Sequence, residues 1–151
     1  MNPGNCIFCQ IIARQKPAEI LYEDELTLAI LDIRQPKIGG HVLVIPREHI
    51  QNIHSLPERL FAPMMRTTKL LTDALKETIG CSGINHLISN GRSAGQTVFH
   101  LHIHIFPRNS KWELFAYYLR AFVLRQNPSG AELARMAEPI REKITLLTAN
   151  A

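Results

Sequence analysis

Three histidines alternate with apolar residues in the stretch Gln96–Pro107, and this alternation constrains the fold more than any other feature of the sequence. Side chains of a β-strand point alternately to its two faces, so a strand here places His100, His102 and His104 on one face. At about 3.3 Å of rise per residue, neighbouring histidines lie roughly 6–7 Å apart. The apolar residues between them are expected to pack under helices on the other face: Phe99, Leu101, Ile103 and Ile105. Because each imidazole titrates near neutrality and needs a partner when covered, three aligned imidazoles indicate chemistry rather than stability.

The length and composition are those of one ordinary globular domain. The chain has 151 residues, of which 46% are apolar and 20% are charged, so we expect residues 1–151 to form a single domain. No apolar run is long enough to span a membrane, and no secretory leader is recognisable. The net charge of +4 is scattered rather than clustered, so a nucleic acid is not an expected partner. An odd count of three cysteines argues against a disulfide framework and favours a reduced, cytoplasmic compartment.

The residues before the histidine stretch predict the strands of a sheet. Strands are expected at residues 20–23, 27–33, 41–46 and 84–89, because these runs are apolar or alternating and are bounded by turn residues. The segments Gln35-Pro36-Lys37 and Gly39-Gly40 are expected to form the turn between the second and third strands. A short helix is expected over residues 10–14.

Capping boxes predict the helices. Ser55-x-x-Glu58 is expected to start a long helix that continues to about Thr78 and ends at Gly80, with a kink or restart at Pro63. Two further boxes, Ser110-x-x-Glu113 and Ser129-x-x-Glu132, predict a C-terminal helical extension over about residues 109–148. The extension holds no cluster of reactive side chains, so it is expected to serve packing or an interface.

Cys6-x-x-Cys9 has the spacing of half a tetrahedral zinc site, although a redox pair or two packed cysteines would have the same spacing. His49 follows a predicted strand, and one histidine of the triad would complete a closed set of two sulfurs and two nitrogens. His100 is the best fourth ligand because it is farthest from the glycine-loop chemistry expected around His102. A closed set of this kind is structural rather than catalytic.

Asp32 and the glycine-bearing loop at residues 90–95 each allow two interpretations. The carboxylate of Asp32 is either a solvated strand end or a group that binds two sugar hydroxyls. The glycines of the loop either let backbone N–H groups approach a phosphate closely or only supply the turn of a hairpin. Position in the sequence does not separate these alternatives.

His102 is the candidate nucleophile, with His104 on the same face and His41 at the start of a neighbouring strand. A neutral imidazole nitrogen attacks phosphorus when the other ring nitrogen donates to a fixed acceptor. A second imidazole can stabilise phosphate oxygens or protonate the leaving group. The histidines could instead bind a catalytic metal, but no acidic residue within the strand joins them.

At this point the sequence resembles a known family. The run from Asn90-Gly91 through Gly95-Gln96-Thr97 to the three histidines is similar to the signature of the histidine triad (HIT) superfamily of nucleotide hydrolases and transferases. The likeness covers about residues 5–108 and includes Cys6-x-x-Cys9 and the segment 40–46. The ending Phe106-Pro107-Arg108 resembles the bacterial-type branch.

The resemblance implies a fold, an activity and a set of residue roles. The fold is α+β, with an antiparallel sheet of about five strands, helices packed on one face and C-terminal helices, in a protein that is usually a homodimer. His102 would form a nucleotidyl-histidine intermediate at the α-phosphate of a purine nucleotide, assisted by His104 and His41. The implied substrate-binding residues are Phe8, Ile11, Ile30, Asp32, Ile33, Ser89, Asn90, Gly95, Gln96 and Thr97. The implied structural zinc site consists of Cys6, Cys9, His49 and His100.

One departure from the family pattern concerns Ser89, which occupies a position where many members have an asparagine that faces the phosphates. The main hypothesis is a hydrolase that cleaves P–N or P–O bonds at the α-phosphate of a purine nucleotide, such as a nucleoside phosphoramidate. The alternatives are a dinucleoside polyphosphate hydrolase and a zinc-stabilised nucleotide-binding module with little catalysis.

Overall fold

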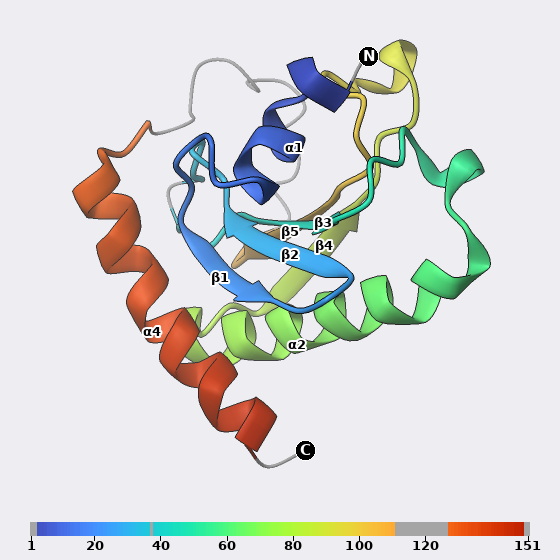
Figure 1. Ribbon diagram of the computed structural model, residues 1–151. Coiled ribbons are helices and arrows are strands. Elements are labelled where there is room, and N and C mark those ends of the chain that lie inside the picture. Colours follow the sequence, from blue (N-terminus) through green and yellow to red (C-terminus); the bar gives the residue numbers. More distant parts are fainter. Residues whose placement is uncertain (1–2, 37, 111–126, 150–151) are drawn as a thin grey trace.

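The described part of the chain forms a single antiparallel sheet covered by helices (Figure 1). The structure is a computed structural model, and it describes residues 3–36, 38–110 and 127–149. Within these residues the strands are β1 (Ile20–Glu23), β2 (Thr27–Leu31), β3 (Val42–Pro46), β4 (Gly83–Leu87) and β5 (Ile103–Arg108). Their order in the five-stranded sheet is β1-β2-β3-β5-β4, and all neighbouring pairs are antiparallel. The predicted α+β fold is therefore confirmed.

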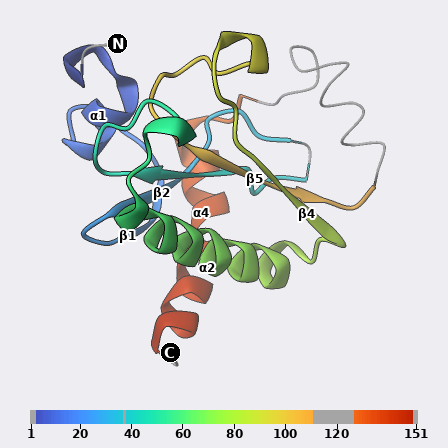
Figure 2. The same cartoon turned by 90° about the vertical axis from the view of Figure 1, so that its right-hand side faces the viewer.

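Helices α2 (Phe61–Ile79) and α4 (Gly130–Ala149) pack on one face of the sheet, whereas the short α1 (Ile7–Ile12) packs on the other. Figure 1 shows α1 above the sheet and α2 below it, and Figure 2 shows the same arrangement after a quarter turn. Side chains of both long helices join the core formed by one sheet face, and α1 contributes Phe8 and Ile11 to a second core on the opposite face. Among the described residues, no helix is both long and apolar enough to cross a membrane.

The two central strands, β2 and β3, are buried along their whole length. Their sequences are almost continuously apolar because both of their faces are covered, one by α2 and α4 and the other by α1. Strand β4 is different, since it lies at the edge of the sheet and its residues are exposed or half-buried. The rigid centre of the sheet therefore lies directly beneath α1.

The strand of the histidine stretch is shorter than predicted. It begins at Ile103, so His100 and His102 lie before the ladder and only His104 lies within it. The backbone N–H of Leu101 donates to the carbonyl of Ile50 at 2.6 Å, which joins this segment to the loop after β3 rather than to the strand β3 itself. The apolar prediction holds for Leu101, Ile103 and Ile105, which are buried against core residues, but not for Phe99, which is half-buried.

Helix α2 starts later than the sequence predicts. Ser55 does not cap it, because it ends a short 3₁₀ turn (Ile53–Ser55), and Pro57, with extended backbone angles (φ −67°, ψ 145°), separates that turn from a second one (Glu58–Leu60) that leads into the helix. The side chain of Asn52 caps the first of these turns by accepting from the backbone N–H of His54. Pro63 lies in the first turn of α2, where a missing N–H costs nothing. The predicted end is correct, since Gly80 has the left-handed conformation of a C-cap (φ 66°).

The C-terminal capping box is confirmed for α4. Ser129 and Glu132 exchange hydrogen bonds between side chain and backbone, with the Ser129 N–H donating to the Glu132 carboxylate at 2.7 Å. One side of α4 faces the core, where Leu133, Ile140 and Ile144 are buried. The helix expected after Ser110-x-x-Glu113 lies outside the described residues. The short helix predicted over residues 10–14 is α1, which begins at Ile7 rather than at residue 10.

Gly40 determines how the loop between β2 and β3 approaches α2. Its backbone is left-handed (φ +71°), and a Cβ atom here would lie 2.7 Å from Cδ1 of Ile79 and 3.1 Å from Cδ2 of Leu75. Only glycine satisfies both the conformation and the space. The close approach places the next residue, His41, directly before β3, which begins at Val42 rather than at residue 41 as predicted.

Candidate active site

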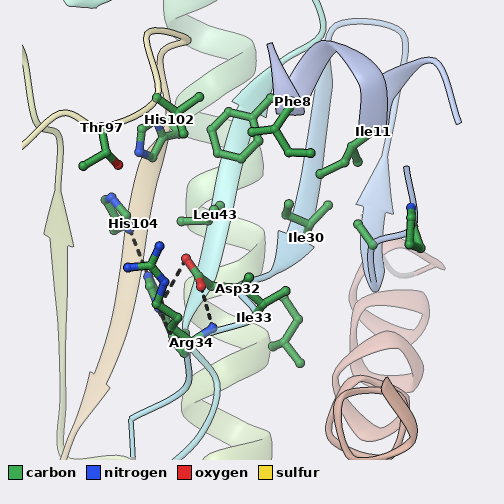
Figure 3. A pocket seen from close by; sticks show the side chains of 16 residues that line it. Phe8, Ile11, Ile30, Asp32, Ile33, Arg34, Leu43, Thr97, His102 and His104 are labelled. Carbon is green, nitrogen blue, oxygen red and sulfur yellow. Dashed lines mark hydrogen bonds and ion pairs between the residues drawn. The ribbon is translucent and has the colours of Figure 1, made fainter. Parts of the chain in front are cut away.

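A cavity of about 390 Å³ lies on the face of the sheet that α1 covers. It has an apolar end, formed by side chains of α1 and β2, and a polar end near β5 (Figure 3). Nine of the residues predicted for the site line it: Phe8, Ile11, Ile30, Asp32, Ile33, His41, Thr97, His102 and His104. The volume suits a ligand of the size of a mononucleotide.

His102 lies at the polar end of the cavity, beside Thr97 (Figure 3). Its Nδ1 is 2.7 Å from the backbone carbonyl of His100. Because a carbonyl only accepts, Nδ1 carries the proton. Burial lowers the pKa of His102 below its ordinary value, with the His100 carbonyl and the charge of Asp32 acting in the opposite direction. The ring is therefore neutral at pH 7 and its Nε2 has an available lone pair.

His41 and His104 form a hydrogen-bonded pair across β3 and β5. Nε2 of His41 is 2.9 Å from Nδ1 of His104, and Nδ1 of His41 is 3.0 Å from the carbonyl of Arg34. The carbonyl accepts from Nδ1 of His41, which leaves Nε2 of His41 to bond to Nδ1 of His104. Phe106 stacks on His41 with ring centroids 4.0 Å apart. The orientation of both imidazoles is therefore set by backbone and by packing.

Asp32 directly follows β2, which ends at Leu31 rather than at Ile33 as predicted. One carboxylate oxygen accepts from the backbone N–H of Arg34 at 2.6 Å, and the other is 3.7 Å from Nδ1 of His41. The carboxylate thus faces the cavity between apolar Ile33 and the histidines (Figure 3).

The structure also brings Asp32 close to His41 and His104, with one potential ligand atom of each within 4.8 Å of the others. The sequence offered no acidic partner for these histidines within their own strand. The ring nitrogens of His41 that face this group already bond to His104 and to the Arg34 carbonyl. The cluster is therefore accounted for as a hydrogen-bond network.

Cys6, Cys9, His49 and His100 come together as a second cluster next to the cavity, as predicted. Nδ1 of His100 is 3.5 Å from the sulfur of Cys6 and 3.5 Å from that of Cys9, and Nδ1 of His49 is 3.1 Å from the sulfur of Cys9. Tetrahedral zinc with bonds of about 2.0–2.3 Å requires ligand atoms roughly 3.3–3.8 Å apart. The two distances from His100 lie in this range, the distance from His49 to Cys9 is slightly shorter, and all four donor atoms lie within 4.8 Å of one another.

Hydrogen bonding and burial prepare these side chains for a cation. Nε2 of His100 donates to the carbonyl of Pro46 at 2.8 Å, which turns the lone pair of Nδ1 toward the two sulfurs. Burial lowers the pKa of His100 to about 4, so the ring is neutral at pH 7. Burial and the neighbouring Cys6 raise the pKa of the Cys9 thiol to about 11. A divalent cation is the group that stabilises such a thiol in its ionised form.

The remaining predicted residues lie in the loop between β4 and β5 and are not among those that line the cavity. The Gln96 side chain is buried and holds this loop, accepting from the N–H of Gly91 and donating to the carbonyl of Gln51. The side chain of Asn90 accepts from the N–H of Ile53 at 2.9 Å. Ser89 is half-buried, and Gly95 is left-handed (φ +83°) at the end of a short 3₁₀ turn.

Several residues that line the cavity were not predicted from the sequence. They are Ile7, Pro17, Ala18, Leu31, Arg34, Leu43 and Val98. Ile7 precedes the predicted Phe8 on α1, and Leu43 lies on β3, the strand next to β2. The apolar character of these two residues was the signal that the sequence offered. Nothing in the local pattern marked Arg34, whose guanidinium extends into the cavity between His104 and Asp32 (Figure 3).

Comparison with known proteins identifies the family of this chain. The HIT domain family model matches residues 13–111, and the chain therefore belongs to the HIT family.

Two relatives and one solved structure relate the chain to named members of that family. The chain is 38% identical over 112 residues to the adenosine 5'-monophosphoramidase HNT1 of Candida albicans, covering 72% of this chain and 73% of that protein. It is 39% identical over 113 residues to the adenylylsulfatase HINT3 of Arabidopsis thaliana, covering 75% of this chain and 57% of that protein. A zinc-bound histidine triad family protein from Mycobacterium smegmatis superposes with a TM-score of 0.78 at 32% identity, covering 99% of this chain and 100% of that one.

Proposed function

We propose that this protein hydrolyses purine nucleotides at the α-phosphate through a nucleotidyl intermediate on His102. The observation that carries the proposal is the hydrogen bond from Nδ1 of His102 to the His100 carbonyl at 2.7 Å, which leaves Nε2 as the nucleophilic nitrogen. The relatives named as a phosphoramidase and an adenylylsulfatase support the same bond cleavage, because both names imply an adenylyl group with a P–N or P–O leaving group.

The reaction would proceed in two balanced steps. In the first, Nε2 of His102 attacks the α-phosphorus, the bond to the leaving group breaks, and the leaving group departs with the electron pair and takes up a proton. In the second, water attacks the same phosphorus, the P–N bond to His102 breaks, and a nucleoside monophosphate is released. His104 is the proposed proton donor and binder of phosphate oxygens, and His41 orients it through the 2.9 Å bond.

The two ends of the cavity suit the other parts of a nucleotide. Phe8, Ile11 and Ile30 offer apolar surface to a purine, and Ile33 forms an exposed flank beside them. Asp32 is the proposed acceptor for two ribose hydroxyls. Thr97, with the backbone of residues 95–97, is proposed to hold the phosphate oxygens. The loop that contains Ser89, Asn90 and Gln96 would then shape the phosphate end of the cavity.

We further propose that Cys6, Cys9, His49 and His100 hold a structural zinc ion. The donor set of two sulfurs and two nitrogens is closed, its donor atoms lie within 4.8 Å of one another, and the similar M. smegmatis structure is described as zinc-bound. When bound, zinc would supply no step of the reaction; it would connect α1 and the His49 loop to the segment that precedes β5. The proposed catalytic histidines are instead those that line the cavity, His41, His102 and His104.

A homodimer is proposed on the basis of β4. This strand pairs with β5 on one side, and on its other side no strand lies against it within the described residues. An edge strand of this kind can pair with a second copy across a two-fold axis and so join two sheets. Light scattering coupled to size exclusion is expected to report twice the mass of the chain, and the mass of a single chain would contradict the proposal.

Turnover of adenosine phosphoramidate by the wild type and by His102→Asn tests the proposed activity. The wild type is expected to release AMP, whereas His102→Asn is expected to lose turnover by at least a thousandfold while retaining AMP binding. His54→Asn is the matched control, because His54 is exposed and lies far from the cavity lining. Undiminished turnover by His102→Asn would refute the mechanism. Comparing wild-type turnover of adenosine phosphoramidate, adenylyl sulfate and a dinucleoside polyphosphate identifies the preferred leaving group.

A further inference from the structure

Gln35, which the sequence marked only as a turn residue, is a fully buried polar side chain in the loop between β2 and β3. Its side chain has 0% exposure. Nε2 donates to the carbonyl of Asp32 at 2.5 Å and to the carbonyl of His41 at 3.1 Å. Oε1 accepts from the backbone N–H of His41 at 2.9 Å. One amide therefore joins the two ends of the loop.

These bonds explain why a polar group is tolerated in the interior. A buried amide without partners costs several kcal/mol, whereas this amide satisfies both of its donors and one acceptor site. All three partners are backbone groups of residues that belong to the site, Asp32 and His41.

The backbone next to Gln35 also orients both site side chains. The carbonyl of Arg34, which belongs to the same peptide group as the N–H of Gln35, accepts from Nδ1 of His41 at 3.0 Å. The N–H of Arg34 donates to the Asp32 carboxylate at 2.6 Å. A displacement of Gln35 would therefore move the acceptor that sets the His41 tautomer and the donor that aims the carboxylate.

We propose that Gln35 is a positioning residue of the active site, which holds Asp32 for the ribose and His41 for its bond to His104. The inference rests on the proposed function, in which those two residues bind and orient the substrate and the proton donor. Gln35 itself does not line the cavity. Its effect on catalysis must therefore pass through Asp32 and His41.

Two variants remove the bonds with little change in size. Gln35→Met loses all three hydrogen bonds, and Gln35→Glu keeps an acceptor but can no longer donate to the two carbonyls. Thr67→Val is the matched control for loss of a buried hydrogen bond. The hydroxyl of Thr67 bonds to that of Thr27 at 2.8 Å, and neither residue lines the cavity.

Non-additivity separates a positioning role from a purely structural one. Gln35→Met is expected to lower kcat for adenosine phosphoramidate at least tenfold in the wild type but less than twofold in a His41→Asn background. Removing both ribose hydroxyls from the substrate is expected to weaken binding strongly in the wild type and much less in Gln35→Met. Thr67→Val is expected to change neither quantity more than twofold. Equal losses from Gln35→Met in both backgrounds would overturn the proposal.

Imidazole nitrogen NMR of the folded protein provides a readout that needs no turnover. The wild type is expected to show His41 with its proton on Nδ1, and Gln35→Met is expected to show a mixture of tautomers. An unchanged His41 tautomer in a folded Gln35→Met protein would overturn the inference even if the proposed activity is correct. If the wild type is inactive but Gln35→Met still changes the tautomer of His41, the result counts against the proposed function and not against the positioning role of Gln35.

Discussion

Acid should destabilise the metal-stripped protein through His100, and the structure gives the size of the effect. Its ring has 0% exposure, and burial lowers its pKa from the ordinary value near 6.5 to about 4. Below pH 6.5 the imidazole of His100 binds a proton in the unfolded chain, whereas in the folded chain it stays neutral until the pH approaches 4. The stabilisation is therefore complete above pH 6.5 and is lost as the pH falls toward 4. At about 1.4 kcal/mol per pH unit, the free energy of unfolding should fall by about 2 kcal/mol between pH 7 and pH 5.

Urea unfolding at a series of pH values in the presence of a chelator measures this loss. The lowered pKa of His102 adds a contribution of the same sign. His100→Gln is expected to be less stable at pH 7 but to show a flatter pH profile, because glutamine can still donate to the Pro46 carbonyl and does not titrate. His54→Gln is the control, since its exposed ring should leave the profile unchanged. Equal stability of the stripped wild type at pH 7 and pH 5 would refute the reasoning.

Three further predictions test the metal cluster, the ribose contact and the core. Cys6→Ser should lose an equivalent of zinc by elemental analysis and melt at a lower temperature. Cys81→Ser should keep the metal, because Cys81 is not part of the cluster. A metal-free wild type of unchanged stability would contradict the zinc proposal. Asp32→Asn should raise KM for the ribonucleotide about tenfold, the loss of a charged hydrogen bond, but barely change that for the 2',3'-dideoxy analogue; equal effects on both would exclude a ribose contact. Leu71→Ala in α2 should cost about 2–5 kcal/mol in chemical denaturation, because Leu71 is fully buried, and a cost below 1 kcal/mol would contradict its place in the core.

Local patterns predicted those elements whose cause is local. The strand Ile20–Glu23 was predicted at its observed bounds, and Ser129 with Glu132 caps α4 as the sequence suggests. Gly80 ends α2 because its left-handed conformation is intrinsically accessible to glycine. In these cases neighbouring residues decide the structure, so a reading of the sequence is sufficient.

One prediction failed because of turns imposed by neighbouring residues, and another failed because of a distant backbone partner. Ser55 does not start α2, because Asn52 and Pro57 impose turns before it. The alternation around His100 and His102 suggested a strand, but Leu101 instead bonds to the carbonyl of Ile50. Such a partner is distant in the sequence and leaves no periodic signal.

The candidate site shows the same division. Residue types alone pointed to the four-ligand cluster, because two thiols and two imidazoles have few other reasons to gather. The role of Gln35 was invisible, since a glutamine before a proline looks like an ordinary turn until its partners at Asp32 and His41 are seen. Contacts between backbone and buried side chains decide such cases.

Mass spectrometry of the rapidly denatured protein, trapped during turnover of adenosine phosphoramidate, tests the central claim most directly. The account predicts an added adenylyl group on the wild-type chain, located by peptide mapping on His102 and absent from His102→Asn. An adenylyl group on another residue, or turnover without any covalent adduct under conditions in which the second step is slow, would contradict it.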